Sequence, residues 1–182
     1  MKIEVIEPSG YCSGVTNAIK IALSAKNENP NSKVIILGQL VHNKHVENFL
    51  LDHQIETYKG KVDEAYINEL DSNSIAIFTA HGHDKKLESY LSDKNIKFYD
   101  ATCPKVNVTH EKINKEINSG HDVIYIGKKN HPETNGALAI SDSIVLYDGV
   151  SSLNNIKDPS PLVINQTTLN IKEIEKTYTF SL

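Results

Sequence analysis

The stretch KFYDATCP, residues 97–104, passes from a short apolar run to a cysteine and then to a proline. Lys97 to Tyr99 have the character of a strand, and Pro104 suits the first position of a helix, so Cys103 stands in the turn between them. An earlier stretch, EPSGYC at residues 7–12, also places a cysteine after a strand candidate and ahead of a predicted helix. The later stretch therefore looks like the start of a second copy of the earlier one.

Short apolar runs recur along the chain and alternate with segments of helical spacing. The strand candidates cover residues 3–6, 34–37, 75–79, 97–99, 123–126, 144–147 and 162–164. Helical spacing appears within residues 46–50, 87–91 and 106–117. This order predicts an α/β fold with parallel sheets and right-handed crossovers. The seven strands could form one doubly wound sheet or two smaller ones, and the repeated cysteine turn favours two domains, residues 1–102 and 103–182.

Composition limits the kinds of partner to expect. The 182 residues, 39% of them hydrophobic, suffice for one core of ordinary size or two smaller ones. A formal net charge of -4 gives no electrostatic reason to expect nucleic acid or an anionic membrane as partner. The N-terminus lacks the apolar run of a signal peptide, and no apolar stretch approaches the roughly 20 residues that span a bilayer. We therefore expect a soluble, cytoplasmic protein.

Residues capable of metal binding or proton transfer follow several predicted strands. They are Cys12, His42, His81, Cys103, His131, Glu133, Thr167 and Thr168. The carboxyl ends of parallel strands meet at one edge of a sheet, where ligands collect, so we expect these side chains to share one rim. All 19 Lys and Arg positions are lysine, so an anion there would be held by lysine, histidine, hydroxyl or backbone groups.

Each of these residues also has an ordinary structural interpretation. A single loop histidine is usually a solvated or capping side chain, and a free cysteine is usually a small buried hydrophobe. Thr167 and Thr168 could simply cap a following helix. Five other histidines lack the strand-end placement and are set aside: His45, His53, His83, His110 and His121. The whole collection is harder to attribute to chance than any single member.

Cys12 and Cys103 are the two cysteines of the chain. Each precedes a predicted helix, whose N-terminal dipole favours thiolate, the form that ligates metals. In a reducing compartment a structural disulfide between them is not expected. Two thiolates from distant segments fit an iron–sulfur cluster better than a catalytic zinc ion, although either site needs at least one further ligand.

The tripeptide His131-Pro132-Glu133 places an imidazole and a carboxylate in one tight loop. Neighbouring dipoles and desolvation can raise a carboxyl pKa, so the arrangement suits proton delivery. An ordinary surface turn, in which the proline only sets the geometry, explains the same motif equally well.

Six motifs, in order, resemble those of the 4-hydroxy-3-methylbut-2-enyl diphosphate reductase family. They are GYCSGV at residues 10–15, VHN at 41–43, AHG at 80–82, DATCP at 100–104, HPE at 131–133 and QTTL at 166–169. The resemblance implies two similar small parallel-sheet α/β domains of a three-domain trefoil, with the third domain missing. The chain departs from the family pattern at Asn130, where glycine is usual, and at Asn165, where threonine is usual.

The resemblance also implies a role for each motif. Cys12 and Cys103 would hold a 4Fe-4S cluster, whose third cysteine ligand is absent from this chain. Glu133 would be the proton source, together with His131. The diphosphate group of the substrate would be bound by His42, His81, His131 and Thr167.

The implied reaction belongs to the non-mevalonate pathway of isoprenoid biosynthesis. It is the reductive dehydroxylation of 4-hydroxy-3-methylbut-2-enyl diphosphate to isopentenyl and dimethylallyl diphosphate, with electrons from a ferredoxin or flavodoxin-type donor. The alternative is an inactive fragment, or a module that binds diphosphate or a metal such as zinc without redox activity. Apolar surface exposed by a missing domain would favour self-association.

Overall fold

The computed structural model describes residues 4, 10–41, 43–149, 153 and 156–178. Strands and helices alternate along the chain, as predicted. In chain order they are α1 (Ser13–Glu28), β1 (Lys33–Leu37), α2 (Lys44–Asp52), β2 (Ile55–Tyr58), α3 (Glu64–Glu69), β3 (Ser74–Phe78), α4 (Lys86–Asp93), β4 (Lys97–Asp100), α5 (Pro104–Asn118), β5 (Val123–Ile126), α6 (Pro132–Leu138), β6 (Ile144–Tyr147), β7 (Leu162–Asn165) and α7 (Ile171–Tyr178).

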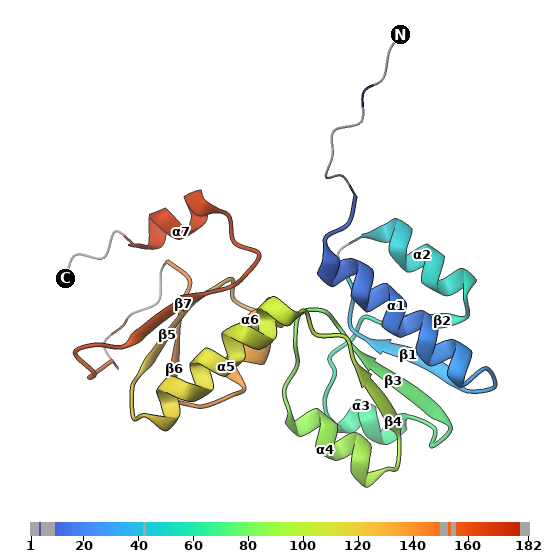
Figure 1. Cartoon of the computed structure of the whole chain (residues 1–182). Helices are drawn as coiled ribbons and strands as arrows, with labels where there is room; N and C mark the ends of the chain where they lie inside the picture. The colour runs from blue at the N-terminus through green and yellow to red at the C-terminus, as the bar shows by residue number, and fades with distance from the viewer. Residues whose placement is uncertain (1–3, 5–9, 42, 150–152, 154–155, 179–182) are drawn as a thin grey trace.

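The strands form two sheets and not one doubly wound sheet. The first has the strand order β2-β1-β3-β4 and the second the order β6-β5-β7, and neighbouring strands in both are parallel. Figure 1 shows the sheets as separate units, with α5 leading from the first into the second. The two-sheet α/β architecture is therefore confirmed. The predicted domain boundary after residue 102 falls between β4 and α5 and stays a prediction.

Six of the seven predicted strands are present. The seventh, at residues 3–6, lies outside the described residues except for Glu4, which is in no strand. Strand β2 was not among the predicted strands; it spans four residues and pairs only with β1 at the edge of the first sheet. Only its first residue, Ile55, is buried, so the segment lacks the continuous apolar run that marks a central parallel strand.

Helices cover both faces of the first sheet. Successive side chains of a strand point to opposite faces, so in β1 Val34 and Ile36 pack beneath α1 and α2, while Ile35 and Leu37 pack beneath α3 and α4. Helix α1 faces the sheet with three fully buried alanines, which allow a close approach. Burial on both faces explains why this strand appears in the sequence as an unbroken apolar run.

The second sheet packs against α5 and α6. Its core contains Val123 and Tyr125 of β5, Ile113 of α5 and Ala137 of α6, all fully buried. The loop after β5 passes through Asn130, whose φ of 64° lies in the left-handed region that favours glycine. Asparagine tolerates this conformation better than most residues with a side chain, which accounts for its presence where the family usually has glycine.

The start of α7 follows the sequence pattern. The Asn170 side chain accepts a hydrogen bond from the Glu173 backbone N–H, and the Glu173 carboxylate accepts one from the Asn170 N–H, each at 3.0 Å. This reciprocal capping box means that Thr167 and Thr168 do not cap the helix. None of the helices in the described part of the chain is both long and apolar enough to cross a membrane.

Candidate functional site

Two cysteines that are distant in the sequence converge at the helix N-termini. Cys12 is the N-cap residue of α1 and Cys103 the N-cap residue of α5. A Cβ atom added to Gly14 would lie 2.8 Å from Cys103 Sγ and 3.8 Å from Cys12 Sγ, so the glycine leaves room for both sulfurs. Both cysteines are free thiols. The positive ends of two helix dipoles therefore lie at the two sulfurs, and a helix N-terminus favours a bound anion.

A cavity of about 280 Å³ opens beside the thiols. Six of the eight strand-end residues line it, namely Cys12, His81, Cys103, Glu133, Thr167 and Thr168. They come from both halves of the chain, from the segments that follow β3, β4, β5 and β7 and from the segment before α1. These strand-end residues therefore border one cavity, whose lining does not include His131.

Glu133 is buried, with 1% of its surface exposed, and does not lie in a surface loop. It occupies the first turn of α6, and its Oε1 accepts a 2.6 Å hydrogen bond from the Thr167 backbone N–H. The Thr167 hydroxyl donates to Oε2 at 3.0 Å, and the Tyr125 hydroxyl lies 3.5 Å from Oε1. Burial raises the pKa of the Glu133 carboxyl, and the Thr167 hydrogen bonds only partly oppose this effect. The surface-turn interpretation of the HPE motif is therefore wrong.

Of the three predicted site histidines, the structure describes His81 and His131. His131 is the N-cap residue of α6, and its Nδ1 accepts a 3.2 Å hydrogen bond from the Glu133 N–H. That bond puts the proton of a neutral ring on Nε2. The His131 ring lies 5.5 Å from the His81 ring, centroid to centroid, in an edge-to-face arrangement. His42 lies outside the described residues, and its neighbour Asn43 caps α2.

Two further residues in or near the site received no role of their own from the sequence. Lys105, in the first turn of α5, lines the cavity and supplies a cation beside it. Gln166, after β7, is 2% exposed, and its side chain accepts hydrogen bonds from the segment after β5 and from α6. Lys105 could have been found because it follows the Cys-Pro pair directly, whereas the partners of Gln166 depend on the tertiary fold.

Comparison with known proteins identifies the family of this chain. A family model described as LytB protein matches residues 3–181. The chain belongs to the LytB protein family. Relatives named 4-hydroxy-3-methylbut-2-enyl diphosphate reductase, from Bacillus mycoides (strain KBAB4) and Bacillus cereus (strain B4264), are each 40% identical to it over 179 residues. These matches cover 96% of this chain and 56% of each relative, so the chain spans little more than half of their length.

Two solved structures have the same fold. The reductase of Plasmodium falciparum, titled E-1-hydroxy-2-methyl-but-2-enyl-4-diphosphate reductase, superposes with a TM-score of 0.80 at 24% identity, covering 94% of this chain and 54% of that one. A structure titled (E)-4-hydroxy-3-methyl-but-2-enyl diphosphate reductase, the terminal enzyme of the non-mevalonate pathway, superposes with a TM-score of 0.77 at 29% identity, covering 94% and 60%. The two-sheet arrangement is thus that of LytB proteins.

Burial of Glu133 makes the stability of this LytB-family chain depend on pH. Its pKa is raised in the folded state above the ordinary 4.5, so its contribution is fully present below that value and is lost as the pH rises through the folded pKa. In Glu133→Gln this dependence disappears. We therefore expect the free energy of unfolding of wild type, relative to the variant, to decline as the pH rises. Urea denaturation at a series of pH values measures this difference in unfolding free energy, and Glu111→Gln, at an exposed position, is the control. A difference between wild type and Glu133→Gln that does not change with pH would contradict the prediction.

Gln166 is expected to be important for stability. Its Oε1 accepts hydrogen bonds from the Lys128 N–H at 3.0 Å and from the buried Thr134 hydroxyl at 3.2 Å, and its Nε2 donates to the Thr168 hydroxyl at 2.6 Å. Gln166→Leu leaves these groups without their partner, at a cost of about 2 to 4 kcal/mol. Chemical denaturation of Gln166→Leu, Thr134→Val and the double variant measures this cost. Strictly additive effects in that cycle would argue against a shared network.

Proposed function

We propose that this chain supplies the cluster-binding and diphosphate-binding part of a 4-hydroxy-3-methylbut-2-enyl diphosphate reductase. The reaction is a reductive dehydroxylation, in which two electrons and two protons convert the allylic alcohol to isopentenyl or dimethylallyl diphosphate and water. The observation that carries the proposal is the convergence of two thiols, a buried carboxyl group and an imidazole on one cavity. The names of the 40% identical relatives support the same reaction.

Cys12 and Cys103 are the proposed ligands of a 4Fe-4S cluster, together with at least one ligand from outside this pair. The fit rests on Gly14, whose missing side chain leaves space against both sulfurs, and on the soft thiolate donors that such clusters prefer. When bound, the cluster supplies electrons and a Lewis-acidic iron for cleavage of the carbon–oxygen bond. A ferredoxin or flavodoxin-type protein is the proposed source of the electrons.

The diphosphate is proposed to lie against His81, His131 and Thr167, with His42 as a further contact. The edge-to-face pair of His81 and His131 provides ring N–H donors, and hydroxyl and imidazole groups can bind phosphate oxygens without arginine. Lys105 adds a positive charge at the cavity wall. This set of groups contains no arginine, and the chain itself has lysine but no arginine.

Glu133 is the proposed source of protons for the leaving hydroxyl group. Its buried carboxyl retains a proton to a higher pH than an exposed glutamate, because its pKa is raised. The Thr167 hydroxyl, 3.0 Å from Oε2, can pass that proton to an oxygen in the cavity. The hydroxyl of the substrate then departs as water, and the second proton is added to the allylic carbon skeleton.

The first experiment is an assay of iron and acid-labile sulfide per chain after anaerobic reconstitution. Wild type is expected to bind about four irons with matching sulfide. A Cys12→Ser/Cys103→Ser double variant should bind almost none. Reduction of the allylic diphosphate by the reconstituted chain, with a chemically reduced ferredoxin, then tests the reaction. Bound zinc without visible charge-transfer absorption would favour the module that binds metal without redox activity.

A further inference from the structure

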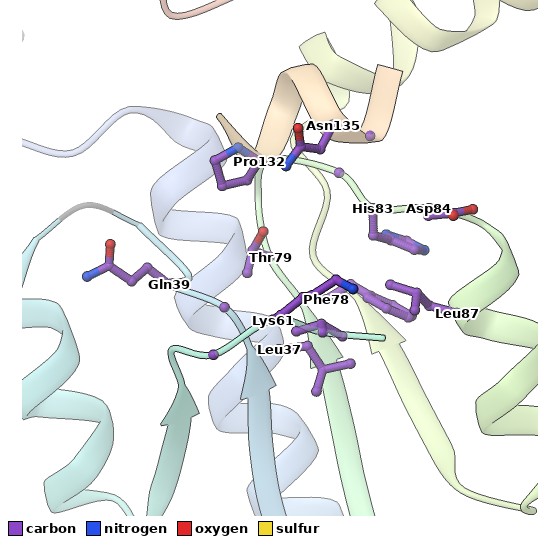
Figure 2. Close-up of a pocket in the computed structure, with 15 residues that line it drawn as sticks. Leu37, Gln39, Lys61, Phe78, Thr79, His83, Asp84, Leu87, Pro132 and Asn135 are labelled. Atoms are coloured by element: carbon purple, nitrogen blue, oxygen red, sulfur yellow. The ribbon is translucent and has the colours of Figure 1, made fainter. Parts of the chain in front are cut away.

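His83, which the sequence analysis set aside, lies in an unusual environment in the first half of the chain. Its side chain is 6% exposed, and its ring stacks on Phe78 with centroids 3.5 Å apart and planes 4° from parallel. Figure 2 shows this stack at the edge of a separate cavity of about 340 Å³, beside Asp84 and Leu87. No cysteine lines that cavity. The environment of His83 is therefore distinct from the thiol site.

The hydrogen bonds of His83 leave one ring nitrogen without a donor. Burial lowers the pKa of His83, which favours the neutral ring. Nε2 lies 2.7 Å from Glu88 Oε1, and since a carboxylate can only accept, the ring proton is on Nε2. Nδ1 then has a lone pair, is buried, and has no hydrogen-bond partner among the described residues. The Asp100 carboxylate oxygen Oδ1 lies 3.9 Å from it.

A lone pair that faces a carboxylate, with no proton between them, is an arrangement that a cation would stabilise. The hydrogen bond from Nε2 to Glu88 leaves the Nδ1 lone pair of His83 available to a metal ion. The Nε2 atom of His110 is also buried without a partner in the described part of the chain. Both rings border a cavity of about 150 Å³, which Lys85 also lines.

Three ligand atoms are close enough to serve one ion. His83, Glu88 and Asp100 each offer one, and all lie within 4.8 Å of one another. In a tetrahedral zinc site, with ligands 2.0–2.1 Å from the metal, such atoms are roughly 3.3 Å apart. Closing the set requires side-chain rotations, among them one that turns a Glu88 oxygen from the His83 Nε2–H towards the ion. The two carboxylates are 28% and 34% exposed, so an ion can reach them from solvent.

A cation already occupies the neighbourhood of these carboxylates. The Lys85 ammonium lies 2.5 Å from Glu88 Oε1 and 4.0 Å from Asp100 Oδ2. Its side chain is 70% exposed, so little packing holds it there. The position is thus electrostatically suited to positive charge, and Lys85 would compete with a metal ion for it.

We propose that His83, Glu88 and Asp100 form a second metal site, separate from the cysteine pair, which takes a divalent ion of the zinc class. One imidazole and two carboxylates suit zinc or cobalt(II), and the absence of thiolate from this set disfavours softer ions. The site joins the loop after β3 to α4 and to the end of β4. Asp100 also accepts a 2.8 Å hydrogen bond from the Thr102 N–H, so a bound ion would brace the turn that leads to Cys103.

The test is zinc titration calorimetry on the 182-residue chain carrying Cys12→Ser and Cys103→Ser, in which the thiol ligands are gone. One zinc per chain is expected. His83→Phe, which keeps a ring to stack on Phe78, and Glu88→Gln should each weaken binding about tenfold or more. Lys85→Met should tighten binding, because it removes the competing cation. His121→Phe is the matched control, since His121 pairs with Asp158 at 2.9 Å and is expected to leave the affinity unchanged.

Cobalt(II) absorption provides a second readout that does not depend on affinity. The proposal expects ligand-field bands without thiolate charge transfer, lost in His83→Phe and retained in His121→Phe. Zinc binding that vanishes in the cysteine double variant would place the ion at the thiols and overturn the proposal. Unchanged affinity in both His83→Phe and Glu88→Gln would overturn it as well. Unfolding curves of each variant establish that a loss of binding is not a loss of fold.

Discussion

Replacement of Gly14 by alanine is expected to lower the iron and sulfide bound after reconstitution roughly tenfold or more, with the fold intact. The added Cβ would stand 2.8 Å from Cys103 Sγ, closer than van der Waals contact, so the thiol must rotate away from its partner. A side-chain end can move at little cost, and alanine is favoured over glycine inside a helix by about 1 kcal/mol. The free energy of unfolding should therefore stay level or rise. Iron analysis and urea denaturation of the same preparation measure both effects.

The control for this variant is Ser24→Ala, an exposed change on the same helix far from the sulfurs. It should leave iron content at the wild-type level. A Gly14→Ala chain that reconstitutes fully would show that the glycine is not required for the two sulfurs to act together. The proposal that Cys12 and Cys103 share one cluster would then lose its main structural support.

Glu133→Gln is expected to reduce the turnover number of the reconstituted protein by about 100-fold or more, with little change in KM. Glutamine can still accept the Thr167 N–H bond through its carbonyl oxygen, so the positions around the cavity should be kept. What is lost is the acidic proton next to the Thr167 hydroxyl. Single-turnover reduction of the allylic diphosphate with a low-potential donor measures the effect.

The comparison variant is Glu111→Gln, which changes an exposed carboxylate of α5 and should retain full turnover. Equal loss of turnover and of substrate affinity in Glu133→Gln would instead indicate that Glu133 mainly positions the substrate. Wild-type turnover in Glu133→Gln would exclude it as the proton source and leave Tyr125 or water for that role.

The sequence alone predicted most of the regular structure. Runs such as residues 34–37 and 123–126 are buried on both faces, so their apolar character is continuous and visible without any partner. Cys12 and Cys103 were expected at helix starts, and both are N-cap residues. Strand β2 was not predicted, because an edge strand with one buried residue has no continuous run of apolar residues. These successes and this failure all depend on patterns within a few neighbouring residues.

The tertiary structure decided what each polar residue does. Glu133 looked equally suited to a surface turn and to a site, and only the tertiary fold brings the segment after β7 to it and buries it beside Thr167. His83 looked like an incidental turn residue, yet the fold places it between Glu88 and Asp100. Local sequence encodes strand and helix because the side chains of each element face the core with a fixed short period, two residues in a strand and about 3.6 in a helix. The environment of a buried carboxyl or imidazole is made by segments tens of residues apart, and no local pattern records which of them will meet.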